Sequence, residues 1–367
     1  MNPIGPHVIE PETRAAPGVY HVAGTVTRCN IDQTHDVITI AEALAQTVSD
    51  LIAKENLFPG QTKRSAFVSF VTPDYRWGMI AWLRSLRKVS SKPVILLVSR
   101  AIDIPPGIPN VYQIVVPALT SDRYTAQRAE FKHTLAKLWI FALTPLTRIF
   151  FIDIDCVILG PIDHLFERDA FLVCPDYVEN RSSRGFNSGV MVFNPTLALR
   201  DHIFATTPGV ESNDGGDQGV LNVVLADRVT FIEERYNVLR HFYYFAAKSK
   251  TDDMRILHYI VKKPWDLHYR ESPDGFLVEL DDLWTAFLTR DELLELVKEW
   301  RRSIFHISER ARIESVRGPT LIPLMERLDT LEQQLRDHNA RLKSWAALAA
   351  ALLLGGAVTL LLQKIVA

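Results

Sequence analysis

The chain has 367 residues, of which 47% are hydrophobic and 23% are charged. These proportions predict a globular protein with a substantial core and exclude an intrinsically disordered chain. The formal net charge of −2 offers no general surface for the phosphate backbone of nucleic acids, so we expect no nucleic-acid partner. The three cysteines have no CxxC spacing and therefore indicate neither a disulfide framework nor a thiolate metal site.

Residues 1–62 are predicted to form an N-terminal extension. The first 20 residues contain four prolines and lack the apolar stretch of a cleaved secretory signal. Apolar residues at helical spacing predict one helix in this extension, at residues 40–54.

Strand-like and helix-like segments alternate further along the chain. Strands are predicted at residues 65–72, 94–99 and 111–116, and helices at residues 77–89 and 131–143. Such alternation predicts a mostly parallel sheet with helices on both faces, which is an α/β fold. We expect this domain to occupy residues 63–310.

The segment IFFIDIDCVILGPIDHLF carries two carboxylates, Asp153 and Asp155, at the end of an apolar run. Residues 149–152 are predicted to form a strand buried on both faces, and open α/β sheets bind ligands at the carboxyl ends of such strands. Side chains two residues apart on an extended segment share a face, so both carboxylates can reach one hard divalent cation. The segment predicts a metal site for a diphosphate, although an Asp that caps a turn has the same local pattern.

Two classes of enzyme use such a pair of carboxylates. The first is the metal-dependent glycosyltransferases. The second is the phosphatases of the haloacid dehalogenase type, whose pattern of an apolar strand and Asp-x-Asp-x-(Thr/Val) is met by Asp153, Asp155 and Val157. In these phosphatases the motif usually lies at the start of the domain, whereas a long α/β pattern precedes it in this chain. An inactive membrane-tethered scaffold is a third hypothesis, and it predicts the loss of polar site residues.

Three later motifs supply polar side chains. FNSGVMVFNP places an amide and a hydroxyl immediately before a predicted strand, where both groups can exchange hydrogen bonds with sugar hydroxyls. DGGDQG is a flexible loop that leads into a predicted helix at residues 220–226, and ILHYIVKKPW has an imidazole at the end of a strand. The candidate residues in these motifs are Asn187, Ser188, Asp214, Asp217, Gln218, His258 and Lys263.

Together these motifs resemble family 8 glycosyltransferases, the retaining nucleotide-sugar enzymes that include glycogenin and related plant glucuronosyltransferases. The resemblance covers roughly residues 63–270 and implies a GT-A type, Rossmann-like sheet. The landmarks are AFVSFVT, TLAKLWIF, FIDIDCVILGPIDHLF, FNSGVMVFNP, DGGDQGVLN, Tyr236-Asn237 and HYIVKKPW. Between His258 and Lys263 the chain departs from glycogenin-like sequences, because this loop is shorter and lacks their glycine.

The resemblance also implies roles for individual residues. Asp153, Asp155 and His258 would hold Mn²⁺ or Mg²⁺, for which oxygen and imidazole ligands are suitable. The residues that would bind the UDP-sugar donor are Thr72, Lys137, Asp153, Asn187, Ser188, Asp214, Asp217, Gln218 and Lys263. The residues that would act in catalysis are Asp217, Gln218 and Lys263. The expected function is metal-dependent, retaining transfer of a hexosyl unit.

The C-terminal region predicts attachment to a membrane. Leucines at helical spacing indicate an amphipathic stalk helix over residues 311–343, either packed on the catalytic domain or paired with a second copy as a homodimer. Residues 344–363 are mostly apolar, and because about 20 such residues cross a hydrocarbon core, they predict a single transmembrane helix. Basic residues before it favour a cytosolic catalytic domain on an endomembrane such as the Golgi or ER. A lipid, membrane protein, other protein or glycan would then be the acceptor.

Overall fold

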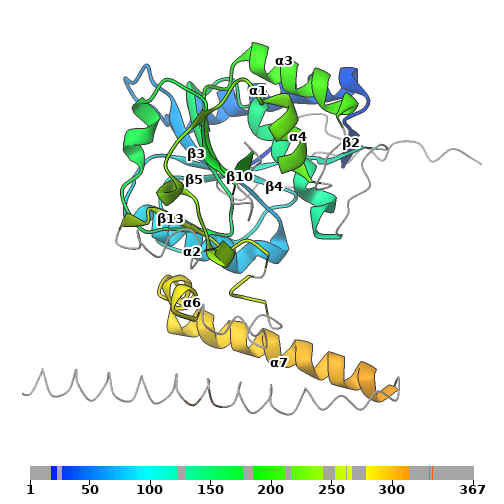
Figure 1. Cartoon of the computed structure of the whole chain (residues 1–367), viewed down its shortest axis with the longest axis vertical. Coiled ribbons are helices and arrows are strands. Elements are labelled where there is room, and N and C mark those ends of the chain that lie inside the picture. The colour runs from blue at the N-terminus through cyan, green and yellow to red at the C-terminus, as the bar shows by residue number, and fades with distance from the viewer. Residues whose placement is uncertain are drawn as a thin grey trace, which may run out of the picture. The chain divides into compact units, whose positions relative to one another are not determined.

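Figure 1 shows the computed structural model of the chain, which divides into two compact units, Met1–Pro264 and Trp265–Ala367. The structure describes residues 18–22, 27–121, 129–176, 185–210, 216–242, 253–261, 263–266 and 278–313, together with Thr330 and Gln333. The predicted transmembrane segment and most of the predicted stalk helix lie outside these residues. Within the described ranges, no helix combines the length and the apolar character that a membrane span requires.

The first unit is built around a mostly parallel sheet. Neighbouring strands follow the order β1 (Val19–His21), β5 (Val111–Val115), β4 (Val94–Val98), β3 (Ser65–Val71), β7 (Arg148–Ile152), β10 (Phe186–Phe193), β9 (Leu172–Pro175) and β11 (Thr230–Phe231). Only β10 is antiparallel to its neighbours β7 and β9 in this sheet. The predicted α/β fold with a mostly parallel sheet is confirmed, and the three earliest predicted strands correspond to β3, β4 and β5.

The strand before the carboxylates is apolar throughout because both faces of the sheet are covered. In β7, Ile149 and Phe151 belong to one hydrophobic core, whereas Phe150 and Ile152 belong to the other. Successive side chains of a strand point to opposite faces, which explains this alternation. The wholly apolar run therefore encodes a central strand, and the first polar residue after it lies at the carboxyl end of that strand.

Helices cover both faces of the sheet, as predicted. The helices that contribute to the core of one face are α1 (Thr34–Glu55), the 3₁₀-helix η2 (Ala129–Ala142), α3 (Leu197–Thr206) and α4 (Asp217–Val224). The main helix of the other face is α2 (Arg76–Arg87), and Figure 1 shows it across the sheet from α3 and α4. Predicted helices at residues 40–54 and 77–89 correspond to α1 and α2, whereas the segment at 131–143 has 3₁₀ rather than α geometry.

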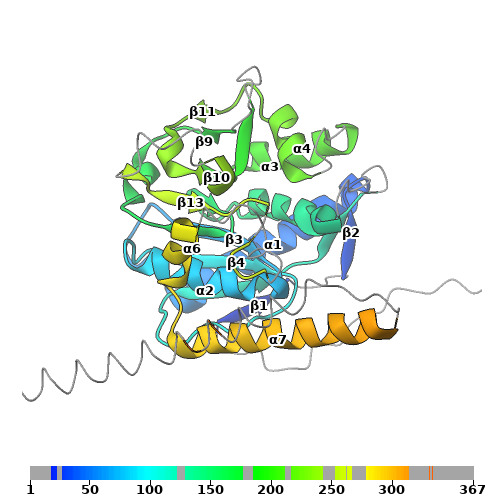
Figure 2. The same cartoon turned by 60° about the horizontal axis from the view of Figure 1, so that its bottom comes forward.

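Part of the predicted N-terminal extension belongs to this sheet and core. β1 pairs with β5 at one edge, and α1 buries Val37, Ala41, Leu44 and Val48 in the same core as the later helices. Figure 2 shows the other end of the sheet, where β9, β10 and β11 lie side by side. The predicted domain boundaries themselves stay predictions.

Two smaller sheets complete the first unit. One joins β12 (Val238–Leu239), β13 (Ile256–His258) and β8 (Cys156–Ile158), with His258 directly opposite Cys156. The other pairs β2 (Arg28–Asn30) with β6 (Ala118–Thr120). Short 3₁₀ turns are η1 (Pro73–Tyr75), η3 (Asp163–Glu167), η4 (Thr207–Gly209), η5 (Glu234–Tyr236) and η6 (Arg240–Phe242). The pairing of β13 with β8 carries the imidazole of His258 to the carboxylates that precede β8.

The second unit contains α6 (Val278–Thr285) and α7 (Arg290–Ile313). Trp300 Nε1 on α7 donates to the backbone carbonyl of Trp265 at 2.7 Å. The ring of Trp265 lies 5.6 Å from that of Trp284 on α6, so tryptophans hold the described part of this unit together.

Candidate active site at the end of β7

The turn that carries Asp153 and Asp155 follows β7 directly. The backbone N–H of Asp153 donates to the carbonyl of Gly189 on β10 at 2.7 Å. Thr72 follows β3, which is a parallel neighbour of β7, and therefore lies at the same carboxyl edge of the sheet. The sheet topology thus positions all three predicted residues at the edge where α/β folds bind ligands.

Lys137 lies between two carboxylates. Its Nζ is 3.1 Å from Asp153 Oδ1 and 2.7 Å from Asp217 Oδ2, and Asp217 also accepts a hydrogen bond from Ser188 Oγ at 2.8 Å. Burial disfavours the charge of this ammonium, but Asp153 and Asp217 outweigh burial and hold the pKa of Lys137 above its ordinary value. These contacts bring together four residues that the sequence predicted for the site.

Asp155 is paired on both sides. One carboxylate oxygen accepts a hydrogen bond from Lys263 Nζ, and the other lies 3.2 Å from His258 Nε2. Burial alone would raise the pKa of Asp155, but Lys263 and His258 hold it well below its ordinary value. For Asp153 burial dominates and raises the pKa, against the opposing effect of Lys137. The two carboxylates therefore have different electrostatic environments although they are two residues apart.

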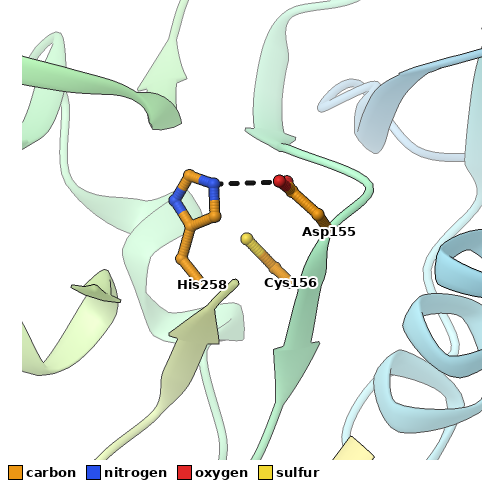
Figure 3. A group of neighbouring side chains, drawn as sticks. All are labelled: Asp155, Cys156 and His258. Atoms are coloured by element: carbon orange, nitrogen blue, oxygen red, sulfur yellow. Dashed lines mark ion pairs between the residues drawn. The ribbon is translucent and has the colours of Figure 1, made fainter. Parts of the chain in front are cut away.

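The side chains of this turn fit a divalent cation. His258 Nε2 lies 3.2 Å from Asp155 Oδ1 and 3.9 Å from Asp153 Oδ2. Metal–ligand bonds of about 2.0–2.2 Å place two ligands of one ion about 3–4 Å apart, so these separations need little adjustment. Figure 3 shows the imidazole and the Asp155 carboxylate pointing toward each other. A site of two carboxylates and one imidazole suits a hard divalent cation.

Cys156 is a site neighbour that sequence reasoning missed. Its thiol, the Asp155 carboxylate and the His258 imidazole have ligand atoms within 4.8 Å of one another (Figure 3). The cause is the register of β8 and β13, because residues directly opposite in antiparallel strands share a face. Burial raises the pKa of the thiol well above its ordinary range, and Asp155 adds to this effect. Cross-strand register cannot be read from the spacing of cysteines.

We expect Cys156→Ser to leave Mn²⁺ affinity unchanged, because a hard cation takes oxygen and nitrogen ligands in preference to a thiol. Mn²⁺ titration followed by electron paramagnetic resonance measures this affinity. Cys174→Ser, which changes a buried thiol on β9, is the matched control. A loss of Mn²⁺ affinity of about tenfold or more in Cys156→Ser alone would show that the thiol supports the cation site.

The predicted sugar-binding residues lie inside secondary structure rather than before it. Asn187 and Ser188 belong to β10 itself, and Asp217 and Gln218 form the first turn of α4. Gln218 Oε1 accepts from Asn187 Nδ2 at 3.0 Å and from the backbone N–H of Ser188 at 3.2 Å. The antiparallel strand β10 and the start of α4 therefore form one wall of the site. Asp214 lies outside the described residues.

The loop between His258 and Lys263 contains a strained position. Val261 has a φ of 66° and a relative exposure of 58%, and a β-branched residue rarely adopts this left-handed conformation. Nearby, Lys263 Nζ also donates to the carbonyl of Tyr259 at 2.8 Å. A glycine at position 261 would adopt the same backbone conformation without steric cost.

Val261→Gly is therefore expected to raise the free energy of unfolding by about 1 kcal/mol. The strain relieved in the folded state should stabilise the protein by more than the extra conformational entropy of glycine in the unfolded chain destabilises it. Urea denaturation measures this change. Val223→Gly, at an equally exposed valine within α4, should instead destabilise the protein by about 1 kcal/mol or less. Destabilisation by both substitutions would contradict strain at Val261.

Residues 109–268 match the family model described as glycosyl transferase family 8. These residues belong to glycosyltransferase family 8. The predicted resemblance is confirmed, and the family 8 region includes the turn after β7, β10, α4 and the loop that carries Lys263.

Two curated relatives show the extent of this likeness. The chain is similar to glycogenin-1 of Mus musculus, with 30% identity over 152 residues, which is 39% of this chain and 45% of the relative. It is also similar to UDP-glucuronate:xylan alpha-glucuronosyltransferase 1 of Arabidopsis thaliana, with 28% identity over 286 residues, or 71% of this chain and 40% of the relative. The chain thus spans less than half the length of these relatives.

A solved structure of a galactosyltransferase, LgtC, in complex with donor and acceptor sugar analogs is distantly similar. It has 16% sequence identity and a TM-score of 0.46, and the match covers 61% of this chain and all of that chain.

Proposed function

We propose that this protein is a metal-dependent, retaining glycosyltransferase of GT-A type that moves a hexosyl unit from a UDP-sugar to a hydroxyl acceptor. The observation that carries the proposal is the convergence of Asp153, Asp155 and His258, with a lysine on each carboxylate, inside the family 8 region. Carboxylates, imidazole and ammonium groups are what recognition of a cation–diphosphate pair requires.

In this proposal Asp153, Asp155 and His258 hold Mn²⁺ or Mg²⁺, which when bound would stabilise negative charge on the departing diphosphate. Lys263 stabilises the same negative charge by donating a hydrogen bond from a fixed position. Its contact with Asp155 favours this role. Thr72 is assigned to the nucleoside because it follows the neighbouring strand β3.

The sugar is assigned to the wall made by β10 and α4. Asn187, Ser188 and Gln218 offer hydrogen-bonding groups there, while Lys137 and Ser188 orient the Asp217 carboxylate. A fixed carboxylate near the anomeric carbon can stabilise positive charge that develops as the bond to the nucleotide breaks. Retention of configuration would follow from attack by an enzyme group or from entry of the acceptor on the face that the nucleotide leaves.

The alternatives fit the observations less well. In dehalogenase-type phosphatases the motif with the nucleophilic Asp usually opens the domain, whereas here β3, β4 and β5 of the same sheet precede Asp153 in the chain. An inactive scaffold would not be expected to retain paired, buried charges, which are costly when they have no role. Membership of family 8 favours the glycosyltransferase over both.

The proposal is tested by calorimetric titration of the full chain with UDP, with and without Mn²⁺, followed by UDP release from UDP-glucose, UDP-galactose, UDP-N-acetylglucosamine and UDP-glucuronic acid. Binding is expected only with the metal, and one donor should release UDP fastest. Asp217→Asn should bind UDP with Mn²⁺ but lose turnover. A folded protein that binds no UDP with Mn²⁺ would refute the proposal, and phosphatase substrates would be tested next.

The acceptor and the location of the enzyme rest on the C-terminal sequence. We infer a membrane anchor at residues 344–363, a cytosolic catalytic domain at an endomembrane, and a lipid or membrane protein as acceptor, because an apolar segment of this length suits a bilayer. Pairing of two copies through residues 311–343 belongs to the same inference. Flotation of the full chain with vesicles, compared with a chain that ends at residue 343, tests the anchor.

A further inference from the structure

A directional chain of hydrogen bonds connects Asp176 with His258 through three side-chain amides. Gln218 Nε2 donates to Asp176 Oδ2 at 3.0 Å, and Asn187 Nδ2 donates to Gln218 Oε1 at 3.0 Å. Asn237 Nδ2 donates to Asn187 Oδ1 at 2.9 Å, and Asn237 Oδ1 faces His258 Nδ1 at 3.0 Å. The chain thus begins beside the wall assigned to the sugar and ends at the imidazole assigned to the metal.

Two backbone groups fix the orientation of these amides. The N–H of Gly189 points at Asn187 Oδ1 at 3.0 Å, and the N–H of Ser188 points at Gln218 Oε1 at 3.2 Å. Because a backbone N–H can only donate, each side-chain atom that it faces must be the amide oxygen. The carboxylate of Asp176 gives the same assignment for Gln218, since an ionised carboxylate can only accept.

The orientation of Asn187 determines the tautomer of His258. Since Asn187 presents its oxygen, Asn237 must present its NH₂ group to it and its own oxygen to His258 Nδ1. An oxygen at 3.0 Å requires a hydrogen on Nδ1, so Nε2 is the only ring nitrogen that can offer a lone pair to a cation. Nε2 is the atom that faces Asp155.

Burial of the three side chains leaves one possible orientation of the amides and one position for the hydrogen on the imidazole. The relative exposures of Asn187, Asn237 and His258 are 7%, 3% and 4%. Water therefore cannot replace a mismatched partner, and a buried polar group without its hydrogen bond costs about 1–3 kcal/mol. Any other arrangement of the amides would place two donors or two acceptors against each other.

We propose that Asn237 is a positioning residue that holds His258 in the Nδ1–H tautomer and so directs Nε2 toward the cation site. The relevance to a metal rests on the proposed function, whereas the tautomer is a property of the chain alone. Metal-binding histidines commonly donate their second ring N–H to a neighbouring oxygen, which sets the ring orientation and the ligand strength. Here that oxygen is an amide whose own orientation is set by β10 and Asp176.

The direct test is ¹⁵N NMR of the full chain with labelled histidine, without metal, with His258→Gln used to assign the signal. The expected spectrum shows a hydrogen on Nδ1 of His258. A spectrum in which Nδ1 carries no hydrogen would overturn the inference. This measurement needs neither metal binding nor turnover, so it is independent of the proposed function.

The second test measures Mn²⁺ affinity by electron paramagnetic resonance in the absence of nucleotide. Asn237→Leu removes both amide bonds at similar volume, and we expect affinity to fall by about 10–100-fold together with loss of the single tautomer. Asn237→Asp keeps an acceptor for Nδ1–H and should retain the tautomer, at the cost of the hydrogen bond to Asn187 Oδ1. Gln113→Leu is the matched control, because it removes a buried amide on β5 that bonds only the backbone of Ile102 in the contacts described.

The outcomes separate the two proposals. Wild-type protein that binds no Mn²⁺ but shows the Nδ1–H tautomer would refute the metal-dependent function and support the inference. Mn²⁺ affinity and tautomer unchanged in a folded Asn237→Leu variant would refute the inference and leave the proposed function standing. If the Asn237→Leu variant does not fold, the wild-type spectrum and the Asn237→Asp variant decide whether Asn237 sets the tautomer.

Discussion

Asp155→Asn is expected to abolish Mn²⁺-dependent binding of UDP and to lower the free energy of unfolding by about 3–5 kcal/mol. The carboxylate of Asp155 is buried and compensates the charge of Lys263, while its other oxygen lies 3.2 Å from His258 Nε2. A neutral amide of nearly the same shape leaves the buried ammonium of Lys263 without its counter-charge. It also removes one anionic oxygen from the set of cation ligands.

Calorimetric titration with UDP and Mn²⁺ and urea denaturation of the full chain measure the two effects. Asp163→Asn is the matched control, since this half-buried carboxylate of η3 accepts a hydrogen bond from Ser90 Oγ at 3.0 Å and lies outside the site. We expect the control to bind UDP as the wild type does. Normal metal-dependent binding by Asp155→Asn would show that the carboxylate pair serves only the stability of the fold.

Gly189→Ala is expected to reduce Mn²⁺ affinity strongly and to destabilise the protein by about 1–3 kcal/mol. A β-carbon at this position would lie 2.3 Å from Cε1 of His258 and 2.8 Å from Oδ1 of Asn187. Both side chains are buried and held by Asn237, so neither can withdraw without breaking hydrogen bonds. Glycine within a strand commonly marks such a close approach.

Mn²⁺ titration and thermal unfolding of Gly189→Ala measure this loss. Gly209→Ala provides the control, because a β-carbon there has no neighbouring atom within 4 Å. The control should change the free energy of unfolding by about 1 kcal/mol or less and keep full Mn²⁺ affinity. Wild-type affinity in Gly189→Ala would mean that His258 can move aside and that its close packing on β10 does not position a ligand.

The amino-acid sequence by itself determined the class of fold and the type of site. The apolar run before Asp153 predicted a strand covered on both faces, and the helical spacing at residues 40–54 and 77–89 predicted α1 and α2. Motif order was enough to identify the family and to nominate Asp153, Asp155 and His258 together. These features depend on local periodicity and residue type, which a sequence records directly.

The tertiary structure decided which side chains meet. The register of β8 with β13 brought Cys156 next to His258, and the antiparallel course of β10 put Gly189 against the imidazole. Lys137 bridges Asp153 and Asp217, although it comes from a helix earlier in the chain. Such contacts depend on strand register and on segments distant in sequence, neither of which appears in any local pattern.

Asn237 illustrates what the sequence determines and what the tertiary structure decides at a single residue. The sequence places it in a family landmark beside Tyr236, but its type and spacing assign no partner to its amide. Its hydrogen bonds to Asn187 and His258 form only when β10, β12 and β13 are folded together. The sequence therefore nominated the candidate residues of the site, whereas packing in three dimensions determined their pairing and orientation, because buried polar groups must satisfy one another.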